Sequence, residues 1–581
     1  MEMEKKNLAI IILAVVLAAS GVGNVILGIS AGAIKAPEQK KVLKEGWTEG
    51  NQPAVLDPTD CWESAGGDVI HQVCDTLWFY EPVSGDYNLV NTLATSRTWD
   101  ATKTELTVTI RDDVWFHDGK QLNASDIKFT FDRIMWFVNY SGELPDTTHE
   151  GDPSSLFYTS RGDPILKEVI VNSLYNFTFV LHAPNAIWEP ICAYCACAIL
   201  SPKSTPAQTY LVLGTDKLVG TGPFKYVHLL AGEEMKFERW DLYWGESVFW
   251  DEVIWVYYPD SVTAGNALLG GEVHKGGFPT SMIQQIIDDP DLIFLNMESS
   301  FIYRYIGFNN EFMNNTLLRK AMAFAYNYTY FVDVVMRGYA IRAHHLLPPG
   351  FPYYNESFRA PVWDTGIARA TMLVAAAADG KDVTGLTAEA VGVNPTNDAN
   401  WLAKNFYTFK FYIPEGSTTI TEMGIAFNND MNKIGISVTN DVMDWEEFIY
   451  TLVHDPDRLN IFYTGWGPDY MDPFNMIEPL LNNLSNANHI QLQDQQIHEW
   501  LWEYEETLAG APPVNSKFAD RKEELIYLIQ QRAINELYVE LPCTYDMVVW
   551  GHHKSIGGVA YNLRFDLWHQ YSYFIPGVPT I

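Results

Sequence analysis

Two aspartates in the last fifth of the chain have types and spacing that could support hydrolysis. Asp469 and Asp472 lie three residues apart in a segment that runs from Gly465 to Pro473. Paired carboxylates act as acid and base in glycosidases, but such pairs arise easily in a chain with 72 Asp and Glu residues. After residue 40 there is no Gly-x-Ser-x-Gly elbow, His-Glu-x-x-His motif or Gly-Lys-Ser/Thr loop. We therefore do not expect an enzyme.

The cysteines raise the possibility of a metal site. Cys192, Cys195 and Cys197 are closely spaced, but no second Cys pair or His of suitable spacing follows, and their neighbours are mostly apolar. We interpret them as buried core residues and expect no metal and no cofactor. Cys61 and Cys74 could form a disulfide in an exported chain, although the sequence does not fix the pairing.

Composition limits the class of protein. The 581 residues are 47% hydrophobic and 19% charged, which excludes a disordered or coiled-coil chain and suggests two to four structural units. The formal charge of −34 would repel a phosphate backbone, so we do not expect a nucleic-acid partner. Aromatic residues make up 14%, including 19 Trp and 31 Tyr, and such rings suit cavities that line or stack on ligands.

The N-terminus predicts export. Residues 1–6 are charged, and residues 8–33 are almost wholly apolar. The run 8–19 has the length of a signal-peptide core, whereas the whole stretch could span a bilayer as an anchor. Both interpretations remain open. No later stretch reaches about 18 apolar residues, so we expect the rest to be one body outside the membrane.

Hydrophobic patterns in this body predict a mixed α/β protein. Residues 106–110 alternate as a strand and lead through a turn to 114–116, which predicts a hairpin-like pair. Helices are expected after the capping residues Ser125, Thr316 and Asp444. Residues 378–400 are rich in Gly, Asp, Thr and Asn and predict a surface loop.

Nine phrases spread over about 420 residues resemble, in order and spacing, one family. This family is the large substrate-binding proteins of ABC importers that includes the oligopeptide- and dipeptide-binding proteins (family 5 solute-binding proteins). The phrases are Leu56-Asp57-Pro58, Leu93-Ala94-Thr95-Ser96, the stretch 106–134 with Trp115-Phe116-His117-Asp118-Gly119, Gly220-Thr221-Gly222-Pro223-Phe224, Glu238-Arg239-Trp240, Phe308-Asn309-Asn310, Arg319-Lys320-Ala321, Lys433-Ile434-Gly435-Ile436 and Gly465-Trp466-Gly467-Pro468-Asp469-Tyr470-Met471-Asp472-Pro473.

The resemblance implies a type II periplasmic-binding-protein fold with two lobes that close on a ligand by a hinge. It also implies three domains, the first of them discontinuous. We predict a signal peptide or anchor with a linker at 1–40. Domain I comprises 41–80, 205–305 and 545–581, domain II is inserted at 81–204, and domain III spans 306–544.

The resemblance also implies where a ligand binds. In the peptide binders of this family, the aspartate of the late Gly-Trp-x-x-Asp phrase holds the ligand's amino terminus, and that position here is Asp469. Gly465, Trp466 and Gly467 match neighbours that give main-chain and packing contacts, and Tyr470 completes this set. Gly-Pro-Asp-Tyr is also a natural turn sequence, so Asp469 could be only a turn residue.

Three further groups of residues complete the predicted site. Asp472 could bind the ammonium instead or stiffen the loop before Pro473. Trp62, Glu63 and Ser64 match the segment that lends an extended edge to the ligand. Arg337 and Arg342 are candidates for a peptide carboxylate only because they fall in domain III.

The predicted function is capture of peptides in an interlobe cleft and delivery to an ABC permease in the membrane. We expect a monomer at the extracellular face of the cell, exported by a signal peptide or tethered by its N-terminal helix. An oligosaccharide ligand is the main alternative, because relatives of this fold bind sugars and the chain is rich in Trp and Tyr. An extracellular hydrolase is a more remote alternative.

Overall fold

The structure is a computed structural model that describes residues 40–80, 88–145, 151–297, 300–507, 517–558 and 572–574. Residues from Lys41 onward form one compact unit of mixed helices and strands, which confirms the predicted α/β class. The predicted export signal or anchor lies outside the described residues. Among those described, no helix combines the length and apolar character needed to cross a bilayer.

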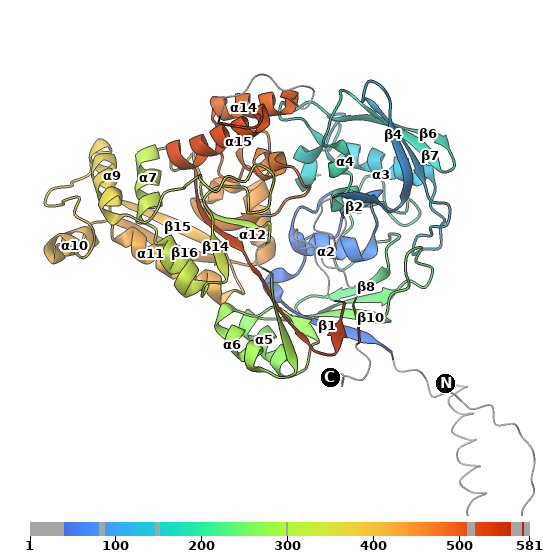
Figure 1. Ribbon diagram of the computed structural model, residues 1–581, viewed down its shortest axis with the longest axis horizontal. Coiled ribbons are helices and arrows are strands. Elements are labelled where there is room, and N and C mark those ends of the chain that lie inside the picture. The colour runs from blue at the N-terminus through green and yellow to red at the C-terminus, as the bar shows by residue number, and fades with distance from the viewer. Residues whose placement is uncertain are drawn as a thin grey trace, which may run out of the picture. The chain divides into compact units, whose positions relative to one another are not determined.

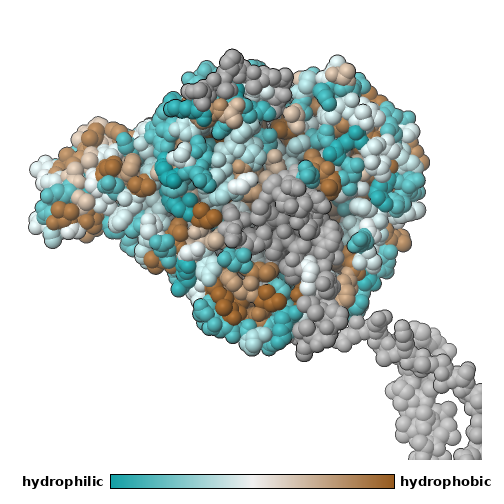
Figure 2. Space-filling view, in the orientation of Figure 1, coloured by the Kyte–Doolittle hydropathy of each residue, from teal (hydrophilic) through white to brown (hydrophobic). Residues whose placement is uncertain are grey.

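A seven-stranded sheet has the strand order β12-β19-β11-β1-β10-β9-β8. Its strand β1 runs parallel to both neighbours, and the remaining pairs are antiparallel. Two helices, α5 and α6, pack on it around Leu268 and Ile286, and Figure 2 shows apolar side chains gathered over this area. The bounds are β1 Val42–Thr48, β8 Phe224–Leu230, β9 Glu234–Arg239, β10 Glu252–Tyr258, β11 Lys275–Gly276, β12 Leu292–Met297, β19 Val548–His553, α5 Ser261–Leu269 and α6 Ile283–Asp288.

A six-stranded sheet has the order β14-β18-β13-β17-β15-β16. Its core contains Phe411 and Phe427 from β15 and α11, and α7 packs against α9 beyond it (Figure 1). The strands are β13 Tyr303–Phe308, β14 Ala340–Arg342, β15 Tyr407–Pro414, β16 Ile436–Met443, β17 Ile461–Trp466 and β18 Glu540–Asp546. The helices are α7 Thr316–Ala325, α8 Tyr328–Tyr330, α9 Thr365–Ala378, α10 Pro395–Leu402, α11 Thr418–Asn432 and α12 Trp445–His454.

A four-stranded antiparallel sheet, β4-β5-β7-β6, is the third. The ring of Phe131 in α3 lies 4.6 Å from that of Phe179 in β7 and 5.9 Å from that of Trp188 in α4. These three aromatic side chains therefore fasten both helices to the sheet. The bounds are β4 Ala94–Trp99, β5 Glu105–Ile110, β6 Leu166–Ser173, β7 Asn176–Leu181, α3 Ala124–Phe137 and α4 Trp188–Ile191.

The remaining elements connect these sheets. They are β2 Trp78–Tyr80, β3 Leu89–Asn91, β20 Ile556–Gly557, β21 Tyr573–Phe574, α2 Ser64–Val73, α13 Glu478–Leu481, α14 Gln495–Glu506 and α15 Arg521–Gln530, with 3-10 turns at Glu49–Asn51, Asp152–Phe157, Cys195–Cys197 (η3), Thr280–Met282, Pro456–Arg458 and Pro473–Met476, and π turns at Phe331–Val335 and Gln531–Glu536.

Three local predictions need correction: one hairpin and two helix caps. The hairpin is wrong, because β5 pairs with β4 and β7, while 114–116 turns back on 120–122 through a Trp115–Gln121 bridge. The helix predicted after Ser125 forms, but Asn123 is its cap: its Oδ1 accepts from Ser125 N at 2.9 Å. Asn315 likewise precedes Thr316 as the cap of α7. The Asp444 cap of α12 is confirmed.

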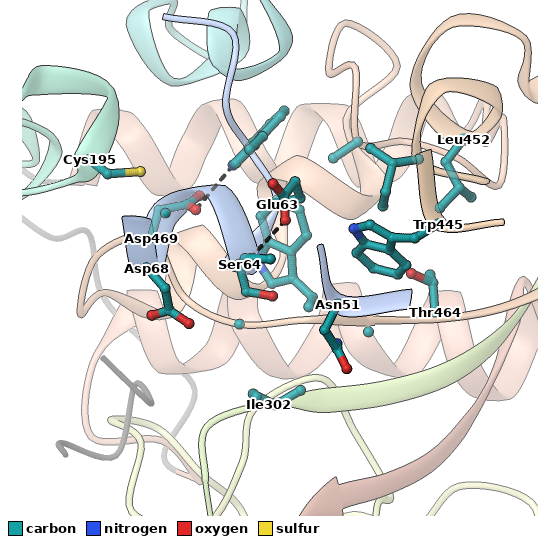
Figure 3. Close-up of a pocket in the computed structure, with 18 of the residues that line it drawn as sticks. Asn51, Glu63, Ser64, Asp68, Cys195, Ile302, Trp445, Leu452, Thr464 and Asp469 are labelled. Atoms are coloured by element: carbon teal, nitrogen blue, oxygen red, sulfur yellow. Dashed lines mark hydrogen bonds between the residues drawn. The ribbon is translucent and has the colours of Figure 1, made fainter. Parts of the chain in front are cut away.

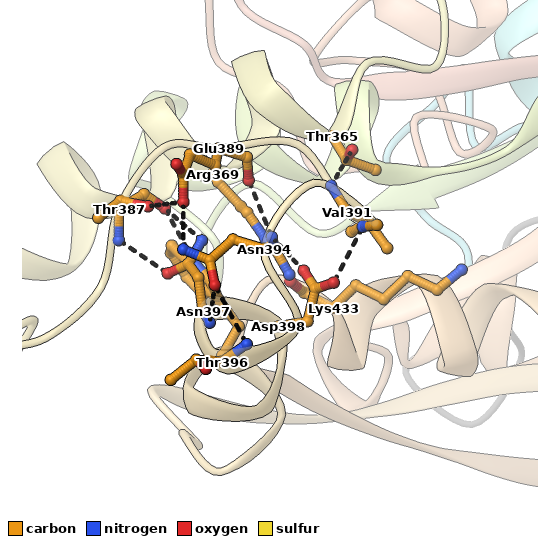
Figure 4. Close-up of polar contacts among 12 residues, drawn as sticks. Thr365, Arg369, Thr387, Glu389, Val391, Asn394, Thr396, Asn397, Asp398 and Lys433 are labelled. Carbon is orange, nitrogen blue, oxygen red and sulfur yellow. Dashed lines mark hydrogen bonds and ion pairs between the residues drawn. The ribbon is translucent and has the colours of Figure 1, made fainter.

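The predicted surface loop at 378–400 is wrong at its end, where α10 begins after Asn394. The stretch before α10 is held by the buried Arg369 of α9 (Figure 4). Its guanidinium donates to Glu389 O at 2.8 Å and to Asp398 Oδ1 at 2.7 Å. Composition predicts a loop before α10, and the two bonds of Arg369 tie that loop and α10 to the neighbouring helix α9.

The domain boundaries stay a prediction. Strands of the seven-stranded sheet come from 42–48, 224–297 and 548–553, those of the four-stranded sheet from 94–181, and those of the six-stranded sheet from 303–546. Two predicted boundaries, at 305/306 and 544/545, fall inside β13 and β18. We propose that these boundaries belong in the connections that flank the two strands.

Candidate functional site

A cavity of about 300 Å³ lies where the start of α2 meets the end of β17 (Figure 3). Four stretches of the chain contribute to its wall: 47–71, 194–195, 302–304 and 445–489. The lining residues are Trp47, Asn51, Trp62, Glu63, Ser64, Ala65, Gly67, Asp68, His71, Tyr194, Cys195, Ile302, Arg304, Trp445, Ile449, Leu452, Val453, Thr464, Gly465, Trp466, Gly467, Pro468, Asp469, Ala487 and His489. Seven of the nine predicted site residues are in this set.

Asp469 follows the end of β17 by three residues and is 5% exposed. Its Oδ1 accepts from Trp62 Nε1 at 3.0 Å, and its Oδ2 accepts from Asn475 Nδ2 at 2.9 Å. The backbone N–H of Asp469 donates to Asn475 Oδ1 at 2.6 Å. A carboxylate offers about four acceptor positions, and these two side-chain donors bind one to each of its oxygens. The aspartate is thus fixed in orientation from both sides.

Tryptophans form the aromatic part of the wall. The ring centroids of Trp62 and Trp466 are 5.3 Å apart at 78°, an edge-to-face pair. Trp466 Nε1 donates to Asn475 O at 2.8 Å, so the same asparagine positions both Asp469 and Trp466. Trp62 belongs to the segment before α2 and Trp466 to β17. Their contact therefore joins two segments about 400 residues apart in the sequence.

Glycines beside Asp469 make room for neighbours. Gly465 pairs with Arg304 in the register of β13 and β17. A Cβ at Gly465 would lie 2.7 Å from Arg304 Cδ and Nη1, closer than side chains tolerate. Gly467 is less restricted, since a Cβ there would meet Ile302 at 3.8 Å. The first glycine is needed to place a guanidinium on the cavity wall.

Glu63 and Ser64 lie at the N-terminus of α2. The Glu63 carboxylate caps this helix, accepting from Ala65 N at 2.7 Å and from Gly66 N at 2.6 Å. Burial raises the pKa of Glu63 to about 7, against the lowering effect of these backbone bonds. Ser64 is exposed at the cavity. The cap role explains the type of residue at Glu63 without any ligand.

Tyr470 and Asp472 line no part of this cavity. Tyr470 is buried at 3% exposure. Asp472 caps the 3-10 turn at Pro473–Met476, accepting from Phe474 N at 2.9 Å and from Tyr504 Oη at 3.1 Å. Of the two alternatives for Asp472, the geometry fits the one that stiffens the loop.

Some residues of the cavity were missed by the sequence analysis. Arg304 lines it, and its Nε lies 2.8 Å from Asp546 Oδ2. His489 lines it too, and burial lowers the pKa of His489 to about 4, so its imidazole is neutral at pH 7. The proposed arginines do not line it: Arg342 stacks on Tyr328 and donates to main-chain carbonyls, and Arg337 lies elsewhere. No local pattern singled out Arg304 or His489.

A second hollow, of about 780 Å³, lies between the four-stranded sheet and α14. Its three glutamates bind partners within the protein. Glu189 pairs with Arg97 at 2.5 Å and accepts from Trp99 Nε1 at 2.6 Å. Glu506 pairs with Arg161. None of the nine predicted site residues lines this larger hollow, so it is not the predicted site.

The turn at 159–163, here the Ser160 turn, inserts between α13 and α14 beside this hollow. Ser160 N donates to Glu505 Oε2 at 3.0 Å, and Ser160 Oγ donates to the same carboxylate. Ser160 O accepts from Trp502 Nε1 at 3.0 Å and from Asn482 Nδ2 at 3.3 Å. Burial raises the pKa of Glu505. This turn links predicted domain II to predicted domain III.

Comparison with known proteins gives relatives of the same kind. The family described as "Bacterial extracellular solute-binding proteins, family 5 Middle" matches residues 88–488. The oligopeptide-binding protein AppA of Bacillus subtilis (strain 168) is 23% identical over 382 residues, 63% of this chain and 64% of AppA. The dipeptide-binding protein of Escherichia coli (strain K12) is 24% identical over 373 residues, 61% of this chain and 66% of that protein. The alignments thus span slightly less than two thirds of these two relatives.

A solved structure supports the same fold. The dipeptide binding protein from Pseudoalteromonas sp. SM9913, in complex with Met-Leu, superposes with a TM-score of 0.76 at 18% identity, covering 92% of this chain and 100% of that chain. The resemblance in the phrases above and the architecture therefore agree. Because the family match covers more than half of its residues, the chain belongs to family 5 of the bacterial extracellular solute-binding proteins.

Proposed function

We propose that this protein captures short peptides in the cavity at Asp469 and delivers them to an ABC permease. The observation that carries the proposal is the buried, oriented carboxylate of Asp469 on the wall of a cavity that segments 47–71 and 445–489 help to form. An ammonium bound there would form a charge-assisted hydrogen bond. The peptide-binding relatives, named above, support the choice of ligand.

The size of the cavity favours short ligands. About 300 Å³ is at the lower end of the range of roughly 300–1,000 Å³ for ligand pockets. We therefore propose peptides of two or three residues as the ligands. Arg304 is the residue we propose for the peptide carboxylate, since it is the guanidinium among the lining residues.

The remaining parts of the proposal concern the cell. We propose that the body works as a monomer at the extracellular face, exported by a signal peptide or tethered through residues 8–33. The lobes would close by a hinge as the ligand binds. The Trp62–Asp469 bond, between segments from the two predicted lobes, would form on closure.

Fluorescence titration tests the ligand class. Trp47, Trp62, Trp445 and Trp466 line the cavity, so binding should change the intrinsic fluorescence of the full chain. The chain is first unfolded and refolded to remove carried ligand, and then titrated with dipeptides, N-acetylated dipeptides and oligosaccharides. We expect saturation by free dipeptides and much weaker binding of the acetylated ones. Saturation by oligosaccharides alone would overturn the peptide proposal and leave the family assignment intact.

A further inference from the structure

Five of the six cysteines lie around α2 and η3, beside the ligand cavity. Cys61 precedes α2, and Cys74 is its C-cap residue. Cys192 ends α4, and Cys195 and Cys197 are in η3, which packs against α2. The sixth, Cys543, is in β18 of the six-stranded sheet. All six are buried thiols in the reduced state, which confirms the core interpretation of Cys192, Cys195 and Cys197, and the structure does not join Cys61 to Cys74.

Cys61 and Cys195 meet against the first turn of α2. A Cβ at Gly66 would lie 2.6 Å from Cys61 Sγ, and a Cβ at Gly67 would lie 3.7 Å from Cys195 Sγ. The Cys195 thiol is also the main cause that raises the pKa of Cys61, and Cys61 Sγ donates to Glu63 O at 3.5 Å. Two consecutive glycines therefore let both sulfur atoms approach the helix backbone and each other.

We propose that Cys61 and Cys195 form a disulfide when this chain folds in an oxidising compartment. The two thiols lose two protons and two electrons as their sulfur atoms bond. A small-molecule or protein disulfide is the oxidant, and it is reduced to two thiols by exchange through a mixed disulfide. This modification is independent of the ligand proposed above.

Other pairings fit the structure less well. Cys61 and Cys74 lie beyond opposite ends of α2, whose ten residues extend about 15 Å at 1.5 Å per residue, well over the Cα separation of a disulfide. Cys192 and Cys197 also influence each other, since Cys197 contributes, after burial, to the raised pKa of Cys192, but a bond between them would close only a short turn. Cys543 lies away from the others and donates to Leu541 O at 3.3 Å. A metal does not explain the cluster, since no three His, Cys, Asp or Glu side chains in the described ranges could hold one.

The timing of the reaction follows from burial. The neighbouring Cys195 thiol and then burial raise the pKa of the Cys61 thiol, and thiolate is the form that attacks a disulfide. Once the reduced protein is folded, its thiols should therefore exchange slowly. The bond is expected to form during folding, before α2 and η3 cover the two sulfur atoms.

The disulfide would connect two parts of the cavity wall. Cys61 immediately precedes Trp62, which donates to Asp469, and Cys195 follows Tyr194, another lining residue. The bond would close a loop of more than a hundred residues, so it should restrict the unfolded chain strongly. The segment with Trp62 would then be fixed to η3 covalently.

The test refolds the full chain with and without a mixture of oxidised and reduced glutathione. We expect four free thiols instead of six after oxidative refolding, with a Cys61–Cys195 peptide in the proteolytic map. The oxidised form should have a Tm higher by roughly 5 °C. Glutathione added to the folded, reduced chain should leave six thiols over the same time.

Variants make the assignment specific. Cys61→Ser and Cys195→Ser should each lose the linked peptide, while the matched control Cys543→Ser keeps it. The proposal is overturned if six thiols stay free in the oxidatively refolded wild type, or if the link joins another pair in place of Cys61–Cys195. Because the peptide map of the wild type distinguishes these outcomes, the test holds even where a variant fails to fold.

Discussion

The cavity at Asp469 and the second hollow at Glu505 both bury a carboxylate between distant parts of the chain, yet they use it differently. Asp469 accepts from the side chains of Trp62 and Asn475 on the wall of an open space of about 300 Å³. Glu505 accepts from the main chain and hydroxyl of Ser160, a residue that fills the gap itself. The second hollow is larger, at about 780 Å³. Volume alone therefore does not identify the ligand site.

The comparison separates two contributions to binding. Asp469 is expected to recognise one chemical group of the ligand, whereas Glu505 is expected to stabilise the closed arrangement whatever the ligand is. A contact of the first kind changes selectivity. One of the second kind changes the affinity for all ligands by the same factor, because it shifts the population of the closed state.

The largest expected effect is that of Asp469→Ala. The variant removes the partner of a buried ammonium, so the binding free energy of free dipeptides should weaken by about 2–5 kcal/mol. The binding of acetylated dipeptides should weaken much less. Isothermal titration with both ligands measures the difference. Asp472→Asn is the matched control, since Asp472 caps a turn outside the cavity and should leave the ratio unchanged. Equal losses for both ligands in Asp469→Ala would contradict ammonium recognition.

The next effect is on pH dependence near the Ser160 turn. Burial and then Glu505 raise the pKa of Glu478 to about 8, from an ordinary value of 4.5. The folded state therefore retains this proton, and the resulting stability is present below about pH 4.5 and is lost as the pH rises toward 8. Asn482 donates to Glu478 Oε1 at 2.6 Å and also to Ser160 O.

Glu478→Gln should remove this dependence. Between pH 5 and pH 8 the unfolding free energy of the wild type should fall by about 2–4 kcal/mol relative to the variant, at 1.36 kcal/mol per pKa unit. Urea unfolding at both pH values gives the difference. The contributions of the other titrating groups to this pH dependence cancel in the difference, since both proteins contain them. Parallel pH profiles would show that Glu478 is not protonated in the fold.

A smaller effect is expected for Glu505→Ala. The variant leaves the buried Ser160 N–H without its acceptor, which costs about 1–3 kcal/mol. If the turn holds the closed arrangement, affinity should fall by the same factor for free and acetylated dipeptides. Calorimetry on both ligands checks this, with the more exposed Glu506→Ala as control. A loss of affinity confined to free dipeptides would show that Glu505 takes part in ligand recognition, as Asp469 is expected to do.

The two regions also differ in how far the sequence predicted them. Asp469, Trp466 and Gly465 stand in one short phrase, so a local pattern located them, and Trp62 was placed by its position a few residues after the phrase Leu56-Asp57-Pro58. Arg304 reaches the cavity only because β13 pairs with β17 in a register that sets it opposite Gly465. Asn475 positions Asp469 from within a 3-10 turn. Such partners depend on pairing and on turns that no residue pattern specifies.

The contacts of the Ser160 turn could not be predicted from the sequence for the same reason. Ser160 and Glu505 are 345 residues apart, and neither stands in a recognisable phrase. The hairpin error has a similar cause, because the strand at 105–110 found its partner in β7, about 70 residues later. Helices were predicted well where one face is apolar, but their caps shifted between neighbouring polar residues, as Asn123 and Ser125 show.

The smallest expected effect concerns Arg161, which lies beside Ser160 on the same turn. Its guanidinium pairs with Glu506 and lies 5.4 Å from the Trp502 ring, but the two charged side chains remain about half exposed. Exposed ion pairs contribute at most about 1 kcal/mol, and salt screens them. Arg161→Ala should therefore lower the unfolding free energy by less than about 1 kcal/mol, and by less still in 0.5 M salt, as urea unfolding at two salt concentrations would show. A loss as large as that of Glu505→Ala would mean that charge pairing, rather than the buried main-chain bond to Ser160, holds the turn in place.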